Sequence, residues 1–156
     1  MPQTTNEIDN LSEQLINVTD KSHICDILEK LSLLEDAATT SYILFQTKNP
    51  DIDIVCKAIG ALNSIGDPTS LLVLKNLYKN DTPAKIKVKI IGAISRIALP
   101  EDNIIDFMSN ALKDNNEDVR NSAERAFDIL ESRALASGWV DWIKARQKRI
   151  TANADN

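Results

Sequence analysis

The feature that most constrains this chain is an internal repeat with a period of 32 residues. Residues 59–62 read Ile-Gly-Ala-Leu, and residues 91–94, one period later, read Ile-Gly-Ala-Ile. Two sets of apolar residues recur in the same register: Ile27, Ile59, Ile91 and Ala123, and Leu33, Ile65, Ile97 and Ile129. A fixed period predicts similar structural units that each bury an apolar face against the next unit, so we expect both sets in a shared core.

Each period contains two helical patterns that are separated by helix breakers. Ile54, Ala58 and Leu62 are spaced as one face of a helix, and Leu71 and Leu74 begin a second pattern. The connectors are rich in Asp, Asn, Pro and Gly, which accept the free N–H groups of a helix start or end a helix. We expect helices over residues 5–17, 21–33, 36–47, 51–65, 68–79, 82–97, 101–113, 117–135 and 138–151.

These patterns predict an all-α fold and one domain over residues 1–156. The architecture that fits a fixed period is an α-solenoid of about four antiparallel helix pairs with a C-terminal capping helix. The best-matched repeats span residues 21–135, residues 138–151 are expected to form the capping helix, and residues 152–156 are expected to be a disordered tail. A compact helical bundle is the alternative, but a bundle does not require a fixed period.

Composition and charge exclude several classes of protein. The chain has 156 residues and a net charge of −5, which is not typical of a general nucleic-acid binder. No segment approaches the roughly 18 apolar residues of a membrane span, and the N-terminus lacks the pattern of a secretory signal. Cys25 and Cys56 are flanked by apolar residues and make no disulfide framework, so we expect buried, reduced thiols and a cytoplasmic protein.

Two segments carry a family pattern. Residues 51–68 combine an acidic turn, the alanines Ala58 and Ala61, and a Gly-Asp-Pro exit, and residues 117–126 begin Glu-Asp-Val-Arg and continue with two alanines. These segments resemble HEAT-like repeat proteins, specifically the short-repeat type of the phycobilisome-lyase group. The Val-Arg pair of that family is complete only at residues 119–120. The resemblance implies stacked helix pairs and, since most such proteins are scaffolds, a binding function.

The resemblance also implies that the second helix of each pair lines a concave side of the stack. On the expected helix 82–97, Lys85, Lys89, Gly92 and Arg96 share the face opposite the core, and Lys87 adds to the same lysine cluster. One period earlier this face carries Asp53 and Lys57, so the surface changes from mixed to positive to negative along the chain. We expect a protein partner to bind Lys57, Lys85, Lys89, Arg96, Glu117, Asn121, Glu124 and Asp128. The alternative is a solvated lysine face that only keeps the chain soluble.

Two further features allow two interpretations each. Gly60 and Gly92 lie inside expected helices, where glycine costs about 1 kcal/mol relative to alanine. We expect close approach of neighbouring helices to explain them, and backbone exposed for a ligand is the alternative. Trp139 and Trp142 are three residues apart and are expected to seal the last repeat; together with Arg146 they form a second candidate docking patch, because tryptophan and arginine are enriched at binding hot spots.

The sequence contains no recognisable catalytic constellation. His23 is the only histidine, and on a helix Cys25 points about 200° away from it. Phosphate-binding loop motifs and Cys/His clusters suited to zinc are missing. Acidic pairs such as Glu117 and Asp118 stand at expected helix starts, where they favour the positive end of the helix dipole.

We therefore expect a non-enzymatic adaptor or scaffold that needs no cofactor and no metal and binds a protein, not nucleic acid or a membrane. Two alternatives remain open. The resemblance alone implies a subunit of the bilin-lyase type that handles a chromophore. The third hypothesis is a HEAT-like nucleic-acid binder that uses Lys57, Lys85, Lys89 and Arg96.

Overall fold

The structure is a computed structural model that describes residues 2–99 and 103–139 together with positions 141, 144, 148, 151 and 152. Within these residues the chain forms helices and no strand. The elements, in chain order, are α1 (Pro2–Asn17), α2 (Lys21–Leu34), η1 (Ala37–Thr39), α3 (Thr40–Gln46), α4 (Ile52–Ile65), η2 (Pro68–Ser70), α5 (Leu71–Leu77), α6 (Ala84–Ile97), α7 (Ile104–Ala111) and α8 (Glu117–Ser137), where η denotes a 3-10 turn. The all-α prediction is confirmed for the described part of the chain.

Polar side chains begin the long helices, and glycines end two of them. Asp51 accepts hydrogen bonds from the backbone N–H groups of Asp53 and Ile54 at the start of α4. Asn116 caps α8 in the same way. Gly66 and Gly138 follow α4 and α8 in the left-handed region, with φ angles of 71° and 73°, a conformation that costs glycine little.

The expected helices 36–47, 68–79 and 82–97 differ at their first residues. The first two each begin as a 3-10 turn, η1 or η2, before the α-helix starts. The third starts at Ala84, because Thr82 is used elsewhere: its hydroxyl donates to the carbonyl of Leu77 and accepts from the N–H of Lys79. Thr82 therefore closes the preceding loop and does not cap α6.

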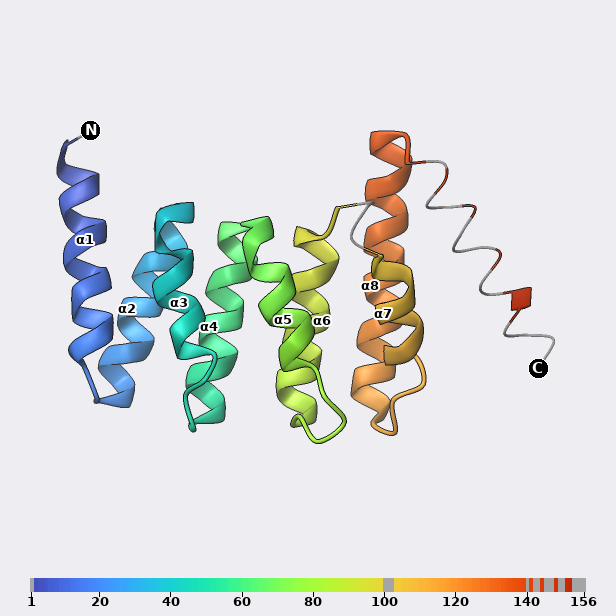
Figure 1. Ribbon diagram of the computed structural model, residues 1–156, viewed down its shortest axis with the longest axis horizontal. Coiled ribbons are helices and arrows are strands. Elements are labelled where there is room, and N and C mark those ends of the chain that lie inside the picture. Colours follow the sequence, from blue (N-terminus) through green and yellow to red (C-terminus); the bar gives the residue numbers. More distant parts are fainter. Residues whose placement is uncertain are drawn as a thin grey trace.

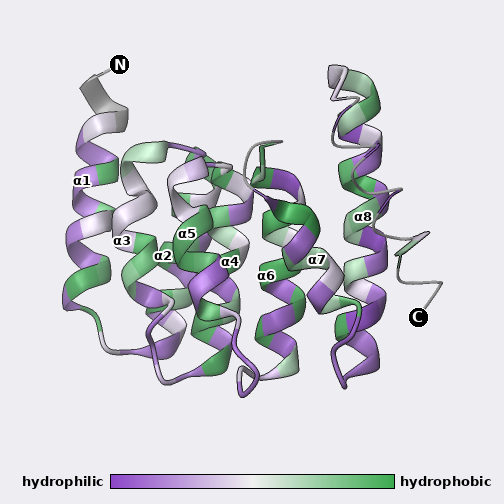
Figure 2. Ribbon diagram, turned by 45° about the vertical axis from the view of Figure 1, so that its right-hand side comes forward, coloured by the Kyte–Doolittle hydropathy of each residue, from purple (hydrophilic) through white to green (hydrophobic). Residues whose placement is uncertain are grey.

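The helices follow one another along the molecule in chain order, and the chain direction alternates from each helix to the next (Figure 1). The long helices α2, α4, α6 and α8 pack side by side. Each short helix, α3, α5 or α7, packs on the long helix that follows it, and α1 packs on α2 and α3. Figure 2 shows hydrophobic and hydrophilic residues alternating along each helix, and buried hydrophobic residues from Leu11 to Ala134 form one core cluster.

The two recurring apolar sets differ in how deeply they are buried. Ile27, Ile59, Ile91 and Ala123 are all buried, with exposed fractions of 1% or less, so this register is confirmed as core. The second register is wrong at both ends: Leu33 is 78% exposed and Ile129 41% exposed, whereas Ile97 is buried. Helix α6 packs on both α4 and α8, whereas α2 and α8 stand at the two ends of the row α2, α4, α6 and α8, and each packs on only one other member of that row.

The expected C-terminal capping helix lies mostly outside the described residues. Helix α8 ends at Ser137, and Trp139 is the last residue before the first gap of this region. Of the expected tail 152–156, only Ala152 is described, and it is helical.

Candidate functional site

A groove of about 510 Å³ lies across the solvent side of α4 and is lined by residues of α2, α4 and α6. We call it the α4 groove. All of its lining residues except Cys56 fall into pairs that are one period apart: Leu28 and Gly60, Glu29 and Ala61, Ser32 and Ser64, Asp53 and Lys85, and Lys57 and Lys89. The repeat in the sequence therefore produces the groove, since equivalent positions of successive long helices meet there.

Small residues on α4 keep this groove open. A Cβ atom added at Gly60 would meet no atom within 4 Å, and the same holds at Gly92 on α6. The expectation that these glycines permit close approach of neighbouring helices is therefore wrong. Gly60 instead leaves helix backbone accessible in the groove, where its carbonyl accepts a hydrogen bond from Ser64 Oγ at 3.3 Å.

Three charged side chains form a ladder across α2, α4 and α6. Lys21 Nζ lies 2.7 Å from Asp53 Oδ2, and Lys85 Nζ lies 2.6 Å from Asp53 Oδ1. Hydrogen bonds from Lys21 and then from Lys85 lower the pKa of Asp53 to about 2. The same bonds raise the pKa values of both lysines. The side chains are half exposed, so the ladder fixes where the charges lie more than it stabilises the fold.

The groove holds one further ion pair, and another lysine in its lining has no acidic partner among the described residues. Lys57 Nζ lies 3.3 Å from Glu29 Oε2. Lys89 also lines the groove, but within the described part of the chain it forms no ion pair. Arg96 is exposed on the same side of α6, two turns beyond Lys89, and is likewise unpaired among these residues.

The predicted acidic residues of α8 do not reach the α4 groove. Glu117, Asn121, Glu124 and Asp128 are exposed and spaced as one face of α8. Two other residues of α8, Asp118 and Arg125, line a second hollow of about 370 Å³ between α6 and α8, which we call the α6–α8 hollow. Its lining residues are Ala84, Lys85, Val88, Lys89, Asp118 and Arg125. The structure thus groups Lys57, Lys85 and Lys89 and keeps the predicted α8 residues apart from them.

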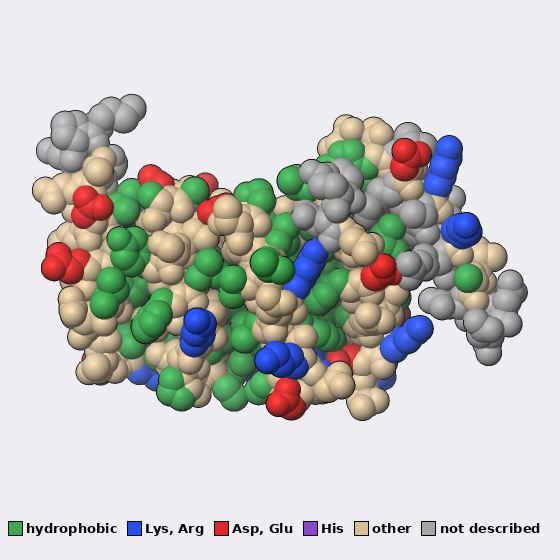
Figure 3. Space-filling model, viewed as in Figure 1, with side chains coloured by type: hydrophobic (Ala, Val, Ile, Leu, Met, Phe, Trp, Pro, Cys, Tyr) green, Lys and Arg blue, Asp and Glu red, His purple; other side chains and the backbone are tan. Residues whose placement is uncertain are grey.

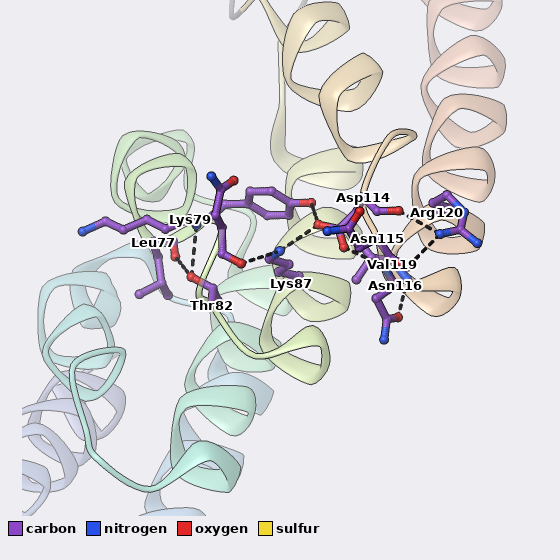
Figure 4. A network of polar contacts seen from close by, with 11 residues as sticks. Leu77, Lys79, Thr82, Lys87, Asp114, Asn115, Asn116, Val119 and Arg120 are labelled. Carbon is purple, nitrogen blue, oxygen red and sulfur yellow. Dashed lines mark hydrogen bonds and ion pairs between the residues drawn. The ribbon is translucent and has the colours of Figure 1, made fainter.

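Lys87 does not belong to the surface cluster. Its exposed fraction is 6%, because it lies two residues from Lys85 on a helix and points to the other side. Its Nζ lies 2.7 Å from Asp114 Oδ2 and 3.2 Å from the carbonyl oxygen of Asn80 (Figure 4). It also lies 5.2 Å from the centre of the Tyr78 ring.

The network around Lys87 connects the loop after α5 to the loop after α7 (Figure 4). Asp114 also accepts from the hydroxyl of Tyr78 and the N–H of Asn116. Burial opposes ionisation of Asp114, but hydrogen bonds from Lys87 and the two other donors outweigh it and lower the pKa of Asp114. Burial and the Asp114 carboxylate raise the pKa of Tyr78. The network pairs Lys87 with Asp114 and joins the two loops, so we call it the loop clasp.

The second candidate docking patch is only partly described. Trp139 is half-buried against the core, and the guanidinium of Arg133 lies 5.5 Å from the centre of its ring. Arg133 Nη1 also donates to the carbonyl of Ser95 on α6 at 2.7 Å. Trp142 and Arg146 lie outside the described residues, so a docking role of this patch stays a prediction.

The side of the molecule that carries α3, α5 and α7 has a different character. Hydrophobic side chains are spread over it, with a few lysines or arginines among them (Figure 3). Phe45 and Leu72 are its most exposed large apolar residues, at 64% and 67%, and Tyr42 is 38% exposed. Residue spacing did not predict this exposed apolar surface, since spacing alone does not show which side of a helix lacks neighbours.

The residues considered for chemistry remain separate. His23 is exposed, and its backbone N–H donates to the Asp20 side chain. Cys25 and Cys56 are free, and burial raises the pKa of the Cys56 thiol. Over the described ranges no group of three or more His, Cys, Asp or Glu side chains could hold a metal ion. None of the described helices is long and apolar enough to cross a membrane.

Lys21, Glu29 and the bridging role of Asp53 were not predicted from the sequence. The signal was present, because Lys21, Asp53 and Lys85 are spaced by one period and alternate in charge. Comparison with known protein families and with curated proteins found no match to this chain.

Proposed function

We propose that this chain is a small HEAT-like α-solenoid that works as a non-enzymatic adaptor and binds a segment of a protein partner in the α4 groove. The observation that carries the proposal is the composition of the groove, whose lining is built almost entirely from pairs of residues one period apart. Equivalent side chains recur at regular intervals on such a surface. It therefore suits an extended peptide, whose side chains are also regularly spaced.

The charges of the groove favour a protein partner over a nucleic acid. Lys57 and Lys85 each face an acid of the groove, Glu29 or Asp53. A polyphosphate would have to approach these two carboxylates, whereas a peptide can offer one acidic group to Lys89 and leave the existing pairs in place. We expect these charges to determine which peptide binds and in which orientation, and to add little to the affinity.

Affinity capture tests the proposal. The tagged chain is exposed to a lysate of its own host, in parallel with the variants Lys89→Glu and Lys79→Glu. Lys79 is exposed on the loop after α5, so the second variant matches the change of charge away from the groove. We expect the wild type and Lys79→Glu to retain one protein in stoichiometric amount, and Lys89→Glu to lose it at an unchanged melting temperature.

The same proteins are then mixed with duplex DNA and, separately, with free bilin. DNA binding that falls steeply with salt would replace the adaptor by the nucleic-acid alternative, and visible absorbance after mixing with bilin would replace it by the chromophore alternative. Equal capture of the protein by Lys89→Glu would remove the groove from the proposal.

A further inference from the structure

The ladder of ion pairs ends at Lys85, so the charged residues beyond it are open to charged groups of a partner. Lys85 pairs backward with Asp53 on α4 at 2.6 Å. Glu117 stands one period after Lys85, as Lys85 stands one period after Asp53. No ion pair joins Lys85 to Glu117 among the described residues, so the carboxylate of Glu117 is left for another cation.

Unpaired charges of opposite sign therefore lie on neighbouring helices. On α6, Lys89 and Arg96 are exposed without an acidic partner in the described structure. On α8, Glu124 and Asp128 are exposed and also unpaired within the same residues. Helices α6 and α8 pack directly against each other. Packed helix axes are about 10 Å apart, a distance that about three residues of extended chain cover.

Between these two charged surfaces lies the α6–α8 hollow. Ala84 and Val88 give it an apolar part, Lys85 and Lys89 stand on its α6 side, and Asp118 and Arg125 stand on its α8 side. An apolar side chain can enter the hollow while the residues before and after it reach the charges on either side.

We propose that the partner segment is a bipolar peptide, with an acidic group over Lys89 and Arg96, an apolar side chain in the α6–α8 hollow, and a basic group over Glu124 and Asp128. This inference rests on the proposed function, since it specifies the kind of segment that the adaptor binds. Nucleic acids and anionic membranes lack the basic group, so the acids of α8 would repel them. The opposite signs on α6 and α8 also fix which end of the segment lies over which helix.

Synthetic peptides and nuclear magnetic resonance of the isotope-labelled full chain test the inference. The probe is Glu-Glu-Glu-Ala-Leu-Ala-Lys-Lys-Lys. The control, Glu-Lys-Glu-Ala-Leu-Ala-Lys-Glu-Lys, has the same composition, but its two ends carry side-chain charges of only −1 and +1 in place of −3 and +3. We expect the probe to bind about tenfold more tightly than the control at low salt, with amide shifts on α6 and α8, and the difference to shrink in high salt.

Charge reversal then separates specific docking from general attraction. We expect Lys89→Glu with Arg96→Glu, and separately Glu124→Lys with Asp128→Lys, to weaken binding of the probe about tenfold each. All four substitutions together should restore binding, because the peptide then docks with its ends exchanged. The matched control, Lys48→Glu with Lys79→Glu on the loops after α3 and α5, should leave binding unchanged.

Each other outcome overturns the inference. Equal binding of probe and control peptide, or a fourfold variant as weak as the two double variants, shows that the separate charged ends are not recognised. If the host protein is still captured in a Lys89-dependent way while the probe fails, only the bipolar inference falls. If no host protein is captured either, the adaptor proposal falls with it.

Discussion

Lys21 and Asp53, one period apart in the sequence, lie 2.7 Å apart in space, and Lys85, one period further on, binds the other oxygen of the same carboxylate. Successive long helices thus present equivalent residues to one another. This relationship converts a periodic sequence into a regular surface. It gives Asp53 two cationic partners, whereas Lys89 forms no ion pair with a described residue.

The ladder predicts a specific response to acid. The pKa of Asp53 is about 2 in the folded chain, below the ordinary value of 3.8. Its stabilising contribution is therefore present above about pH 4 and is lost as the pH falls toward 2. We expect a carboxyl titration followed by nuclear magnetic resonance to give a pKa near 2, and near 3.8 after Lys21→Ala with Lys85→Ala. An Asp53 pKa that both chains share would contradict the ladder.

The buried pair of Lys87 and Asp114 predicts that one substitution lowers the stability and that a second substitution restores most of it. Lys87→Met removes the ammonium and leaves the Asp114 carboxylate buried without its cation, which costs about 3 kcal/mol in such pairs. Adding Asp114→Asn removes the remaining charge, so we expect the double variant to recover most of this loss. Urea unfolding measures both free energies. If the single variant unfolds like the wild type, the loop clasp contributes nothing to stability.

The glycines separate into two groups with opposite predictions. Gly60→Ala and Gly92→Ala should each stabilise the fold by about 1 kcal/mol, because the new methyl group meets no atom within 4 Å and helix propensity improves. Gly66→Ala should destabilise it by about 1 kcal/mol, because Gly66 has a φ of 71°. Thermal unfolding distinguishes the signs. A loss of stability in Gly60→Ala would mean that the groove is more crowded than described.

The two thiols predict an order of labelling. Cys25 is partly exposed, whereas Cys56 is buried and burial raises the pKa of its thiol. We expect a thiol reagent to modify Cys25 first and Cys56 much more slowly. In a Cys25→Ser chain the remaining reaction reports on the α4 groove, which Cys56 lines, and a bound partner should slow it further. Equal rates for both thiols would contradict the described burial.

Much of the fold was predictable from local chemistry. Asp51 at the start and Gly66 after the end define α4 within one residue of the expected range, since a side-chain cap and a left-handed glycine act over a few residues. The buried register of Ile27, Ile59 and Ile91 followed from the period itself. The 3-10 starts before α3 and α5 were not foreseen, because the sequence pattern does not distinguish a 3-10 first turn from an α-helical one.

The residues of the α4 groove were predicted less completely, because residue spacing does not show which side of a helix faces a neighbouring helix. Lys85, Lys87 and Lys89 form one cluster in the sequence, yet the structure divides them between the groove and the interior. Leu33 keeps the register of Ile97, yet it is 78% exposed and Ile97 is buried. The pairing of Lys57 with Glu29 and the hollow between α6 and α8 depend on packing between helices, which residue spacing alone does not specify.

The buried ammonium of Lys87 has a consequence for how the chain assembles. The equivalent positions one period before and after are Val55 and Val119, and all three are buried. Units that share one period and one buried register can dock in the wrong order during folding, with one copy taking the place of another. A lysine in the interior is tolerated only beside Asp114, so a misplaced unit would carry an unneutralised charge into an apolar contact. The lysine therefore distinguishes one unit from its neighbours and disfavours docking of the units in the wrong order.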